Sequence, residues 1–131
     1  MQRAIIITVL AIVCAACSYT PTQPSPFTSP TTQTLSGTVY PSGTTTTWLS
    51  VTHAGTLSAA LVSAEPATVL GMSLGMLSGG HCDPLQRTDA HPGSGPQIVM
   101  ATEAGMYCLE VSDLGSAPLS GVTYSVSVGF Y

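Results

Sequence analysis

The stretch that decides the fold lies near the end of the sequence and runs Val122-Thr123-Tyr124-Ser125-Val126-Ser127-Val128-Gly129-Phe130. Large apolar side chains alternate here with small or hydroxyl-bearing ones. A period of two is typical of a β-strand with one buried face and one solvated face. This stretch therefore predicts a strand that packs one face against a hydrophobic core.

The same alternation recurs upstream, most clearly in residues 105–113 and 55–63. Short turns rich in glycine, such as Pro41-Ser42-Gly43, separate the alternating segments, and no capped helical pattern is present. The expected fold is all-β, a single antiparallel β-sandwich of jelly-roll type with about seven strands. The strands are expected near residues 35–40, 46–53, 55–63, 68–77, 97–102, 105–113 and 122–130. One connection, residues 78–96, is expected to be a long loop.

The first 17 residues have the layout of a bacterial lipoprotein signal. Met1-Gln2-Arg3 is a short positive start, residues 4–16 are apolar, and the small pair Ala15-Ala16 stands directly before Cys17. The apolar run is shorter than the roughly 20 residues that cross a bilayer, and its length matches a signal peptide; an ordinary secretory signal is the alternative. We therefore expect the mature protein to begin at a lipidated Cys17 and to be fastened by its acyl chains to a membrane of the bacterial cell envelope. The residue after the cysteine is Ser18 and not an aspartate. A serine at this position resembles the signal that sorts lipoproteins to the outer membrane.

Residues 18–34 are expected to form a linker. They contain four prolines among threonine, serine and glutamine. Such a segment cannot bury enough apolar surface to fold, so we expect an extended chain. We expect residues 35–131 to form the β-sandwich domain. The length of the mature chain suits one small domain.

The charge balance excludes one class of partner. Beyond residue 17 the chain has a single basic residue, Arg87, against six carboxylates, which is a net charge of −5, and it has no lysine. Binding to nucleic acid needs lysine and arginine at the phosphates. Nucleic acid is therefore not an expected partner.

The cysteines predict one disulfide. The signal accounts for the first two of the four cysteines, which leaves Cys82 and Cys108. In an exported chain an even remainder predicts a disulfide. A metal site completed by His81 and His91 is the alternative, although the two cysteines lack the close two-residue spacing of zinc ligands. A disulfide would pin the loop 78–96 onto the strand that follows it.

Four segments carry a resemblance to a known family. They are Leu35-Ser36-Gly37-Thr38-Val39, Trp48-Leu49-Ser50-Val51-Thr52-His53-Ala54-Gly55-Thr56-Leu57, Gly105-Met106-Tyr107-Cys108-Leu109-Glu110-Val111-Ser112-Asp113-Leu114-Gly115 and Val122-Thr123-Tyr124-Ser125-Val126. Together they resemble the bacterial pre-peptidase C-terminal domain over essentially all of residues 35–131. The resemblance implies a compact β-sandwich or jelly roll, usually without catalysis, with calcium, matrix or polysaccharide binding in some relatives.

One motif is typical of an enzyme. Gly71-Met72-Ser73-Leu74-Gly75 fits the G-x-S-x-G nucleophile elbow, and Asp83 and His91 follow in the Ser, Asp, His order of α/β-hydrolases. The elbow places its serine on a tight turn between a strand and a helix, beside an oxyanion hole. No helical period follows Ser73, so we assign no catalytic residue and expect the glycines to mark a bulge or a close backbone approach.

Acidic residues offer a possible cation site. Asp83, Asp89 and Asp113, with loop carbonyls, could bind Ca²⁺, which takes six to eight oxygen ligands. The sequence lacks the D-x-D-x-D-G pattern of a calcium loop, and ordinary turn formation by aspartate is the alternative. We therefore assign no cofactor and no metal site, with Ca²⁺ as the possible exception.

Aromatic residues offer a possible glycan site. Trp48, Tyr40 and Tyr124 could form a stacking platform for sugars on one face, whereas the alternative places Trp48 in the core of the sandwich. The candidate ligand face consists of Asp83, Asp89, His91 and Trp48.

These observations favour a non-catalytic envelope lipoprotein at the cell surface or in the periplasm. Its disulfide-pinned sandwich would serve as a binding or structural module for a protein or a glycan. The alternative is a lipid-anchored accessory module for a secreted peptidase or a polysaccharide-active enzyme.

Overall fold

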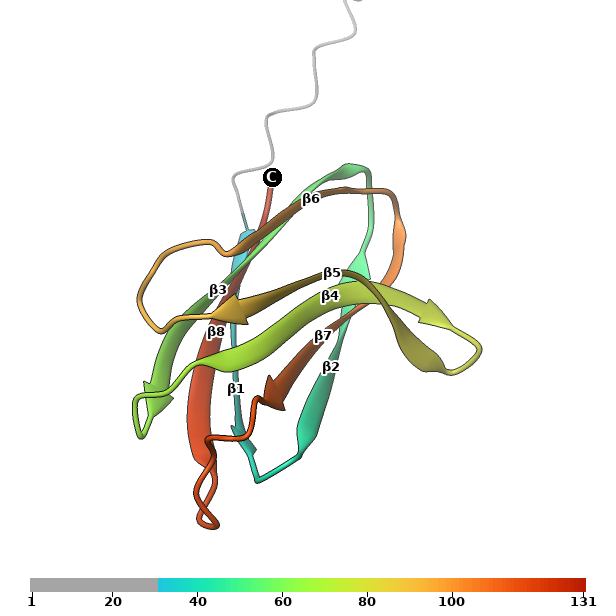
Figure 1. The fold of residues 1–131 in the computed structure, drawn as a ribbon. Coiled ribbons are helices and arrows are strands. Elements are labelled where there is room, and N and C mark those ends of the chain that lie inside the picture. Colours follow the sequence, from blue (N-terminus) through green and yellow to red (C-terminus); the bar gives the residue numbers. More distant parts are fainter. Residues whose placement is uncertain (1–30) are drawn as a thin grey trace, which may run out of the picture.

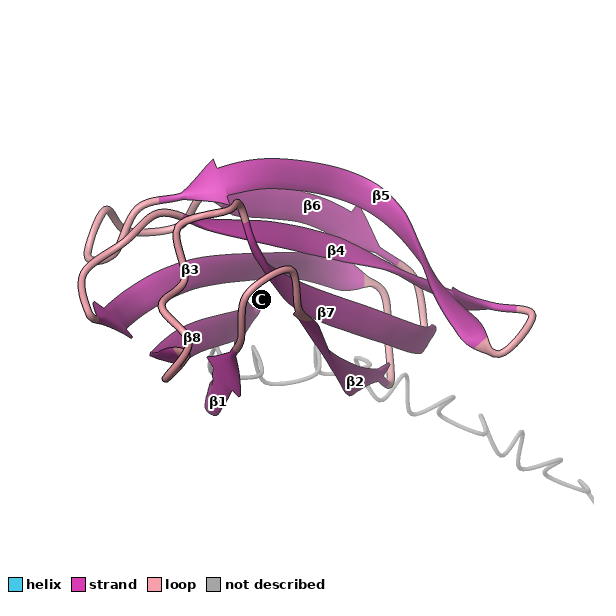
Figure 2. Ribbon diagram, turned by 60° about the horizontal axis from the view of Figure 1, so that its bottom comes forward, coloured by secondary structure: helices cyan, strands magenta, loops and turns pink. Residues whose placement is uncertain are grey.

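A computed structural model describes residues 31–131 and confirms the all-β sandwich. Two antiparallel sheets of four strands lie face to face (Figure 1, Figure 2). The first sheet has the strand order β1-β8-β3-β6 and the second has the order β2-β7-β4-β5. The strands are β1 (Thr31–Val39), β2 (Thr44–Val51), β3 (Gly55–Glu65), β4 (Leu70–Ser78), β5 (His81–Ala90), β6 (Ile98–Thr102), β7 (Gly105–Asp113) and β8 (Val122–Phe130). Within residues 31–131, no helix has the length and apolar character needed to cross a membrane.

The expected long loop 78–96 is wrong, because most of it is strand β5. β4 and β5 are joined through Gly79 and Gly80, whose φ angles of 59° and 83° suit a two-residue hairpin turn. β5 is an edge strand and most of its side chains are exposed, so its sequence has no need of apolar alternation. An edge position also tolerates Pro84.

Strand β1 begins four residues earlier than expected. Thr31 pairs with Phe130 and Thr34 pairs with Ser127, so residues 31–34 belong to the first sheet and not to the linker. The backbone hydrogen bonds of β8 hold these residues in place, and their polar side chains gave no sign of it in the sequence. Cys17, the signal and residues 18–30 of the linker lie outside the described residues.

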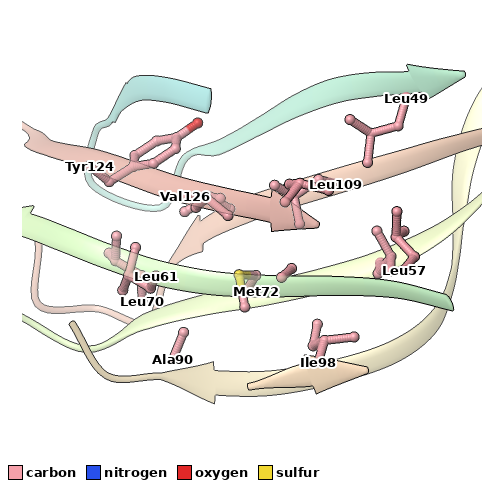
Figure 3. Packing of buried hydrophobic residues seen from close by; sticks show 14 of the residues in the cluster. Leu49, Leu57, Leu61, Leu70, Met72, Ala90, Ile98, Leu109, Tyr124 and Val126 are labelled. Carbon is pink, nitrogen blue, oxygen red and sulfur yellow. The ribbon is translucent and has the colours of Figure 1, made fainter. Parts of the chain in front are cut away.

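The core lies between the sheets (Figure 3). On β8, Val122, Tyr124, Val126 and Val128 are buried, with at most 3 % of their surface exposed, as the alternation predicted. Leucines from both sheets meet these residues. Each fully buried aliphatic side chain contributes about 1.5–3 kcal/mol, so the inward positions of the alternating strands hold the two sheets together.

The predicted disulfide between Cys82 and Cys108 is confirmed, and it joins two strands that are not neighbours. β4 lies between β5 and β7 in the second sheet. Two ordinary strand spacings would separate the Cα atoms by about 9.6 Å, whereas the observed separation is 5.8 Å. The first part of β5 therefore bends over β4 toward β7, at the end of the hairpin that curls in Figure 2.

Gly75 makes this crossing possible. It pairs with Cys108 of β7 on one side and with Pro84 of β5 on the other, next to an irregularity in the ladder after Leu74. A Cβ atom at residue 75 would collide with the carbonyl group of Asp83 and lie 2.7 Å from the Cα atom of Pro84. The expectation that glycine in this segment marks a bulge and a close backbone approach is confirmed.

Asp113 ties two loops together at the end of β7. Its Oδ2 atom accepts a hydrogen bond from the N–H of Ser42 at 2.9 Å. Its Oδ1 atom accepts from the N–H groups of Gly115, Ser116 and Ala117, each at 2.9 Å. The bond from Ser42, with support from the other three, holds the pKa of this carboxyl group below its ordinary value.

Candidate functional site

The outer face of the second sheet carries an open hollow of about 520 Å³. Strands β4, β5 and β7 supply most of its surface, and β2 and the loop after β7 complete it. We call this feature the hollow; it is lined by Thr44, Gly71, Met72, Ser73, Arg87, Thr88, Asp89, Glu110, Ser112 and Leu114.

Strand register brings the polar side chains of the hollow together. Ser73 pairs with Glu110 of β7 on one side and with Arg87 of β5 on the other. One row further along, Gly71 pairs with Asp89. Because paired residues point to the same face of a sheet, three strands place their hydroxyl, carboxylate and guanidinium groups around one space.

Glu110 is held in place by two hydroxyl groups. Its Oε2 atom accepts from the Oγ of Ser73 at 3.4 Å, and its Oε1 atom accepts from the Oγ1 of Thr46 at 3.3 Å. Ser73 is only 8 % exposed, and this hydrogen bond compensates for the burial of its hydroxyl group. The carboxylate of Glu110 therefore lies between Thr46 of β2 and Ser73 of β4.

Gly71 lies at the floor of the hollow, beneath the side chains of Ser112 and Leu114. A Cβ atom at residue 71 would collide with the Oγ of Ser112 and lie 3.1 Å from the Cδ2 atom of Leu114. Both neighbours are the ends of side chains, so the glycine here makes room for these two side chains and does not answer a backbone constraint.

The rim of the hollow offers both donors and acceptors. Arg87 and Asp89 are exposed, and within residues 31–131 neither side chain has an intramolecular hydrogen-bonding partner. Arginine presents five N–H donors, and a carboxylate only accepts. With Glu110, the hollow has one positive and two negative groups, which suits a ligand that both donates and accepts hydrogen bonds.

An exposed apolar strip lies beside the hollow on the same face. Trp48, which is 43 % exposed, pairs with Cys108. Met106 pairs with Ser50 of β2, and Leu77 pairs with Cys82. We call Trp48, Met106, Leu77 and the disulfide the apolar strip.

The structure separates the four residues of the predicted ligand face. Asp89 lines the hollow and Trp48 lies in the apolar strip of the same face. Asp83 pairs with Met76 away from the hollow, and His91 lies in the connection after β5, where its carbonyl oxygen accepts from the Nε2 of Gln97 at 2.6 Å. Only two of the four residues therefore share a face.

Neither expectation for Trp48 and the tyrosines holds. Trp48 is exposed, so it is not part of the core. Tyr124 is buried between the sheets, and Tyr40 is 58 % exposed beyond the end of β1. The proposed platform of three aromatic rings is therefore wrong, because outward and inward positions of the strands separate its members.

Ser73 lies in the middle of β4, where the strand continues on both sides. No helix follows it within residues 31–131, so the strand–turn–helix geometry of a nucleophile elbow is not formed. Asp83 and His91 do not line the hollow. The Ser, Asp, His order of the sequence does not correspond to an assembled triad.

The aspartates of the suggested calcium site do not converge. Among the described residues, no group of three or more histidine, cysteine, aspartate or glutamate side chains is placed to hold a metal ion. The carboxylate of Asp113 already accepts four backbone N–H groups. The disulfide likewise takes the two cysteines of the alternative metal pair.

Sequence reasoning missed Glu110 and Arg87 as site residues. Glu110 was within reach, because the alternation of residues 105–113 places it outward with Cys108. Arg87 was assigned to a loop, so its neighbours were unknown. The two-residue Gly79-Gly80 turn after an alternating strand was the available signal for a returning strand.

A second hollow of about 240 Å³ lies at the opposite end of the sandwich. Threonines, Phe130 and Tyr131 supply much of its surface, and its lining contains no aspartate, glutamate, lysine or arginine side chain. The Nδ1 atom of His53 lies 3.0 Å from the Oγ1 of Thr52. This hollow offers fewer charged contacts than the first.

No protein-family model and no curated protein sequence matches the chain. Solved structures do match. Aeromonas hydrophila PliG, a periplasmic lysozyme inhibitor of g-type lysozyme, aligns with a TM-score of 0.50 and 16 % identity over 78 % of this chain and 86 % of PliG. The Yersinia pseudotuberculosis-derived mitogen YPM aligns with a TM-score of 0.50 and 19 % identity over 77 % of this chain and 85 % of YPM. At these identities the likeness concerns the fold, and the resemblance to the pre-peptidase C-terminal domain stays a prediction.

Proposed function

We propose that this protein is a non-catalytic binding module of the bacterial cell envelope. Cys17 carries its lipid anchor, and the outer face of the second sheet recognises its partner. The observation that carries the proposal is the hollow, where Ser73, Arg87 and Glu110 from three strands surround one open space beside an exposed tryptophan.

The two outer faces of the sandwich differ in a way that supports this assignment. The outward side chains of the first sheet are mostly small or hydroxyl-bearing, as in Ser36, Ser125 and Ser127. The second sheet carries tryptophan, methionine, arginine and two carboxylates on its outer face. Large exposed apolar groups beside convergent polar groups are typical of binding surfaces.

The site chemistry supports binding in place of catalysis. The hydroxyl group of Ser73 donates to Glu110, and no histidine lines the hollow. PliG, which shares the fold, is a periplasmic inhibitor of g-type lysozyme. The lipoprotein signal independently favours an envelope location.

Photocrosslinking in living cells tests the proposal. A benzophenone amino acid replaces Leu114 at the rim of the hollow or, as a control of similar exposure, Val99 on the outer face of the first sheet. We expect an adduct of higher mass from position 114 that weakens in a Trp48→Ala background, and none from position 99. Equal adducts at both positions, or none at position 114, would overturn the proposal.

The anchor is tested by the intact mass of the membrane-extracted protein, with Cys17→Ala as the control. We expect a chain that starts at Cys17 and carries acyl groups. An unmodified mass would show that the module is released and is not anchored.

A further inference from the structure

The outer face of the second sheet has an apolar half and a polar half on adjoining rows. Trp48 follows Thr46 by two positions on β2, and Thr46 contacts Glu110 at the hollow. Residues two apart on a strand lie about 6.8 Å from each other. A ligand of a few linked units can therefore contact the tryptophan and the hollow at once.

The charges of the hollow select the chemistry of the ligand. Arg87 is the only cation beyond residue 17, and Asp89 and Glu110 line the same hollow. This balance disfavours an anionic ligand. Hydroxyl groups both donate and accept, so a neutral polyhydroxy ligand can satisfy the guanidinium group and the carboxylates together.

Trp48 supplies the complementary apolar surface. Its indole is exposed on a strand, beside the disulfide, and presents a flat apolar face with one N–H donor. A sugar ring has a face of C–H groups and an edge of hydroxyl groups. The apolar strip fits that C–H face, and the hollow fits the hydroxyl edge.

The face is preformed, because its side chains stand on strands and the disulfide fastens the edge strand β5. Little ordering is then needed when a short oligosaccharide binds.

We infer that this face binds a neutral oligosaccharide, with one sugar ring stacked on Trp48 and the hydroxyl groups of the next rings held by Arg87, Asp89 and Glu110. The inference rests on the proposed function, for which it names the class of partner. Gly71 has a defined part in it, because its missing side chain lets Ser112 and Leu114 pack over this position and shape the lining of the hollow.

The direct test is titration of the full-length protein, purified in detergent, with three hexasaccharides. Two are neutral, the β-1,4-linked hexamers of glucose and of N-acetylglucosamine, and one is anionic, the hexamer of galacturonic acid. We expect saturable binding of at least one neutral hexamer and at least about tenfold weaker binding of the anionic one. Preference for the anionic hexamer, or no binding of either neutral one, would overturn the inference.

Variants assign the binding to this face. We expect Trp48→Ala and Gly71→Ala each to weaken binding by about tenfold, the range of a central contact in an interface. Trp48→Phe should recover part of the loss, and Val99→Ala on the other sheet should leave binding unchanged. Melting temperatures of all variants separate loss of the site from loss of the fold, and equal binding by Trp48→Ala and the parent would contradict the assignment.

Treatment of the crosslinked adduct distinguishes failure of this inference from failure of the proposed function. If a glycoside hydrolase that cleaves β-1,4 links of glucose or of N-acetylglucosamine degrades the partner of position 114 and protease does not, the partner is a glycan. If protease alone degrades it, the face binds a protein, and the inference fails while the proposed function stands. If no adduct forms at position 114, both fail.

Discussion

Strands β8 and β5 show two ways in which one sequence makes a strand. β8 lies inside the first sheet between β1 and β3, and alternate side chains of it enter the core. β5 lies at the edge of the second sheet, has only Ala90 fully buried, and is fastened by a disulfide. β8, which builds the core, has a regular alternation of apolar residues. β5, which carries Arg87 and Asp89, has no such alternation. Because β5 is free of core burial, it can carry the charged groups that line the hollow.

Removal of the disulfide should have the largest effect on the difference in stability between β5 and β8. The double variant Cys82→Ala, Cys108→Ala opens a loop that spans 26 residues, and chain entropy predicts a loss of about 3.5 kcal/mol from the free energy of unfolding. Urea unfolding measures the loss. Hydrogen exchange should show β5 losing protection before β8, and equally slow exchange in both strands would contradict the role given to the disulfide.

Substitution of Gly75 should displace β5 without touching a cysteine. Gly75→Ala places a methyl group against the backbone of Asp83 and Pro84, and such overpacking costs about 1–3 kcal/mol. Gly129→Ala on β8 is the matched control, because its new methyl group meets the side-chain ends of Ser58 and Tyr131. Thermal unfolding should show a larger fall in melting temperature for Gly75→Ala than for Gly129→Ala. A Gly129→Ala loss as large as that of Gly75→Ala would show that the β5 crossing has no special constraint.

Asp113 should contribute stability that disappears in acid. Its pKa in the folded state is held below the ordinary value of 3.8. The stabilisation is therefore complete above that value and is lost as the pH falls through the folded pKa. We expect Asp113→Asn to lower the melting temperature at neutral pH and to converge with the parent protein in strong acid. A constant gap between the two proteins across this range would exclude the linkage.

The smallest effects on stability should come from outward serines. Ser73→Ala loses a long hydrogen bond to Glu110, and Ser127→Ala on β8 alters the outer face of the first sheet. Each should change the free energy of unfolding by less than about 1 kcal/mol. Only Ser73→Ala should also weaken ligand binding, as titration would show. Equal binding losses from both would mean that the two outer faces act alike.

Much of the fold was open to prediction from local patterns. Alternation placed seven of the eight strands and the inward side of β8, and the count of cysteines in an exported chain predicted the pair Cys82 and Cys108. The start of β1 at Thr31 was missed because its residues are polar and are held by pairing with β8. β5 was missed because an edge strand buries little surface and so leaves no apolar period.

The amino-acid sequence was enough to give the fold class and the inward face of each alternating strand, because burial acts on every second residue and leaves a local signal. It was also enough to give the disulfide, because two cysteines remain once the signal accounts for the other two. Only the tertiary structure decided that Ser73, Arg87 and Glu110 line one hollow beside Trp48. That decision depends on strand order and register across the sheet, which are interactions between residues far apart in the chain. Outward positions are free of the core, so their pattern along the chain does not reveal which of them become neighbours.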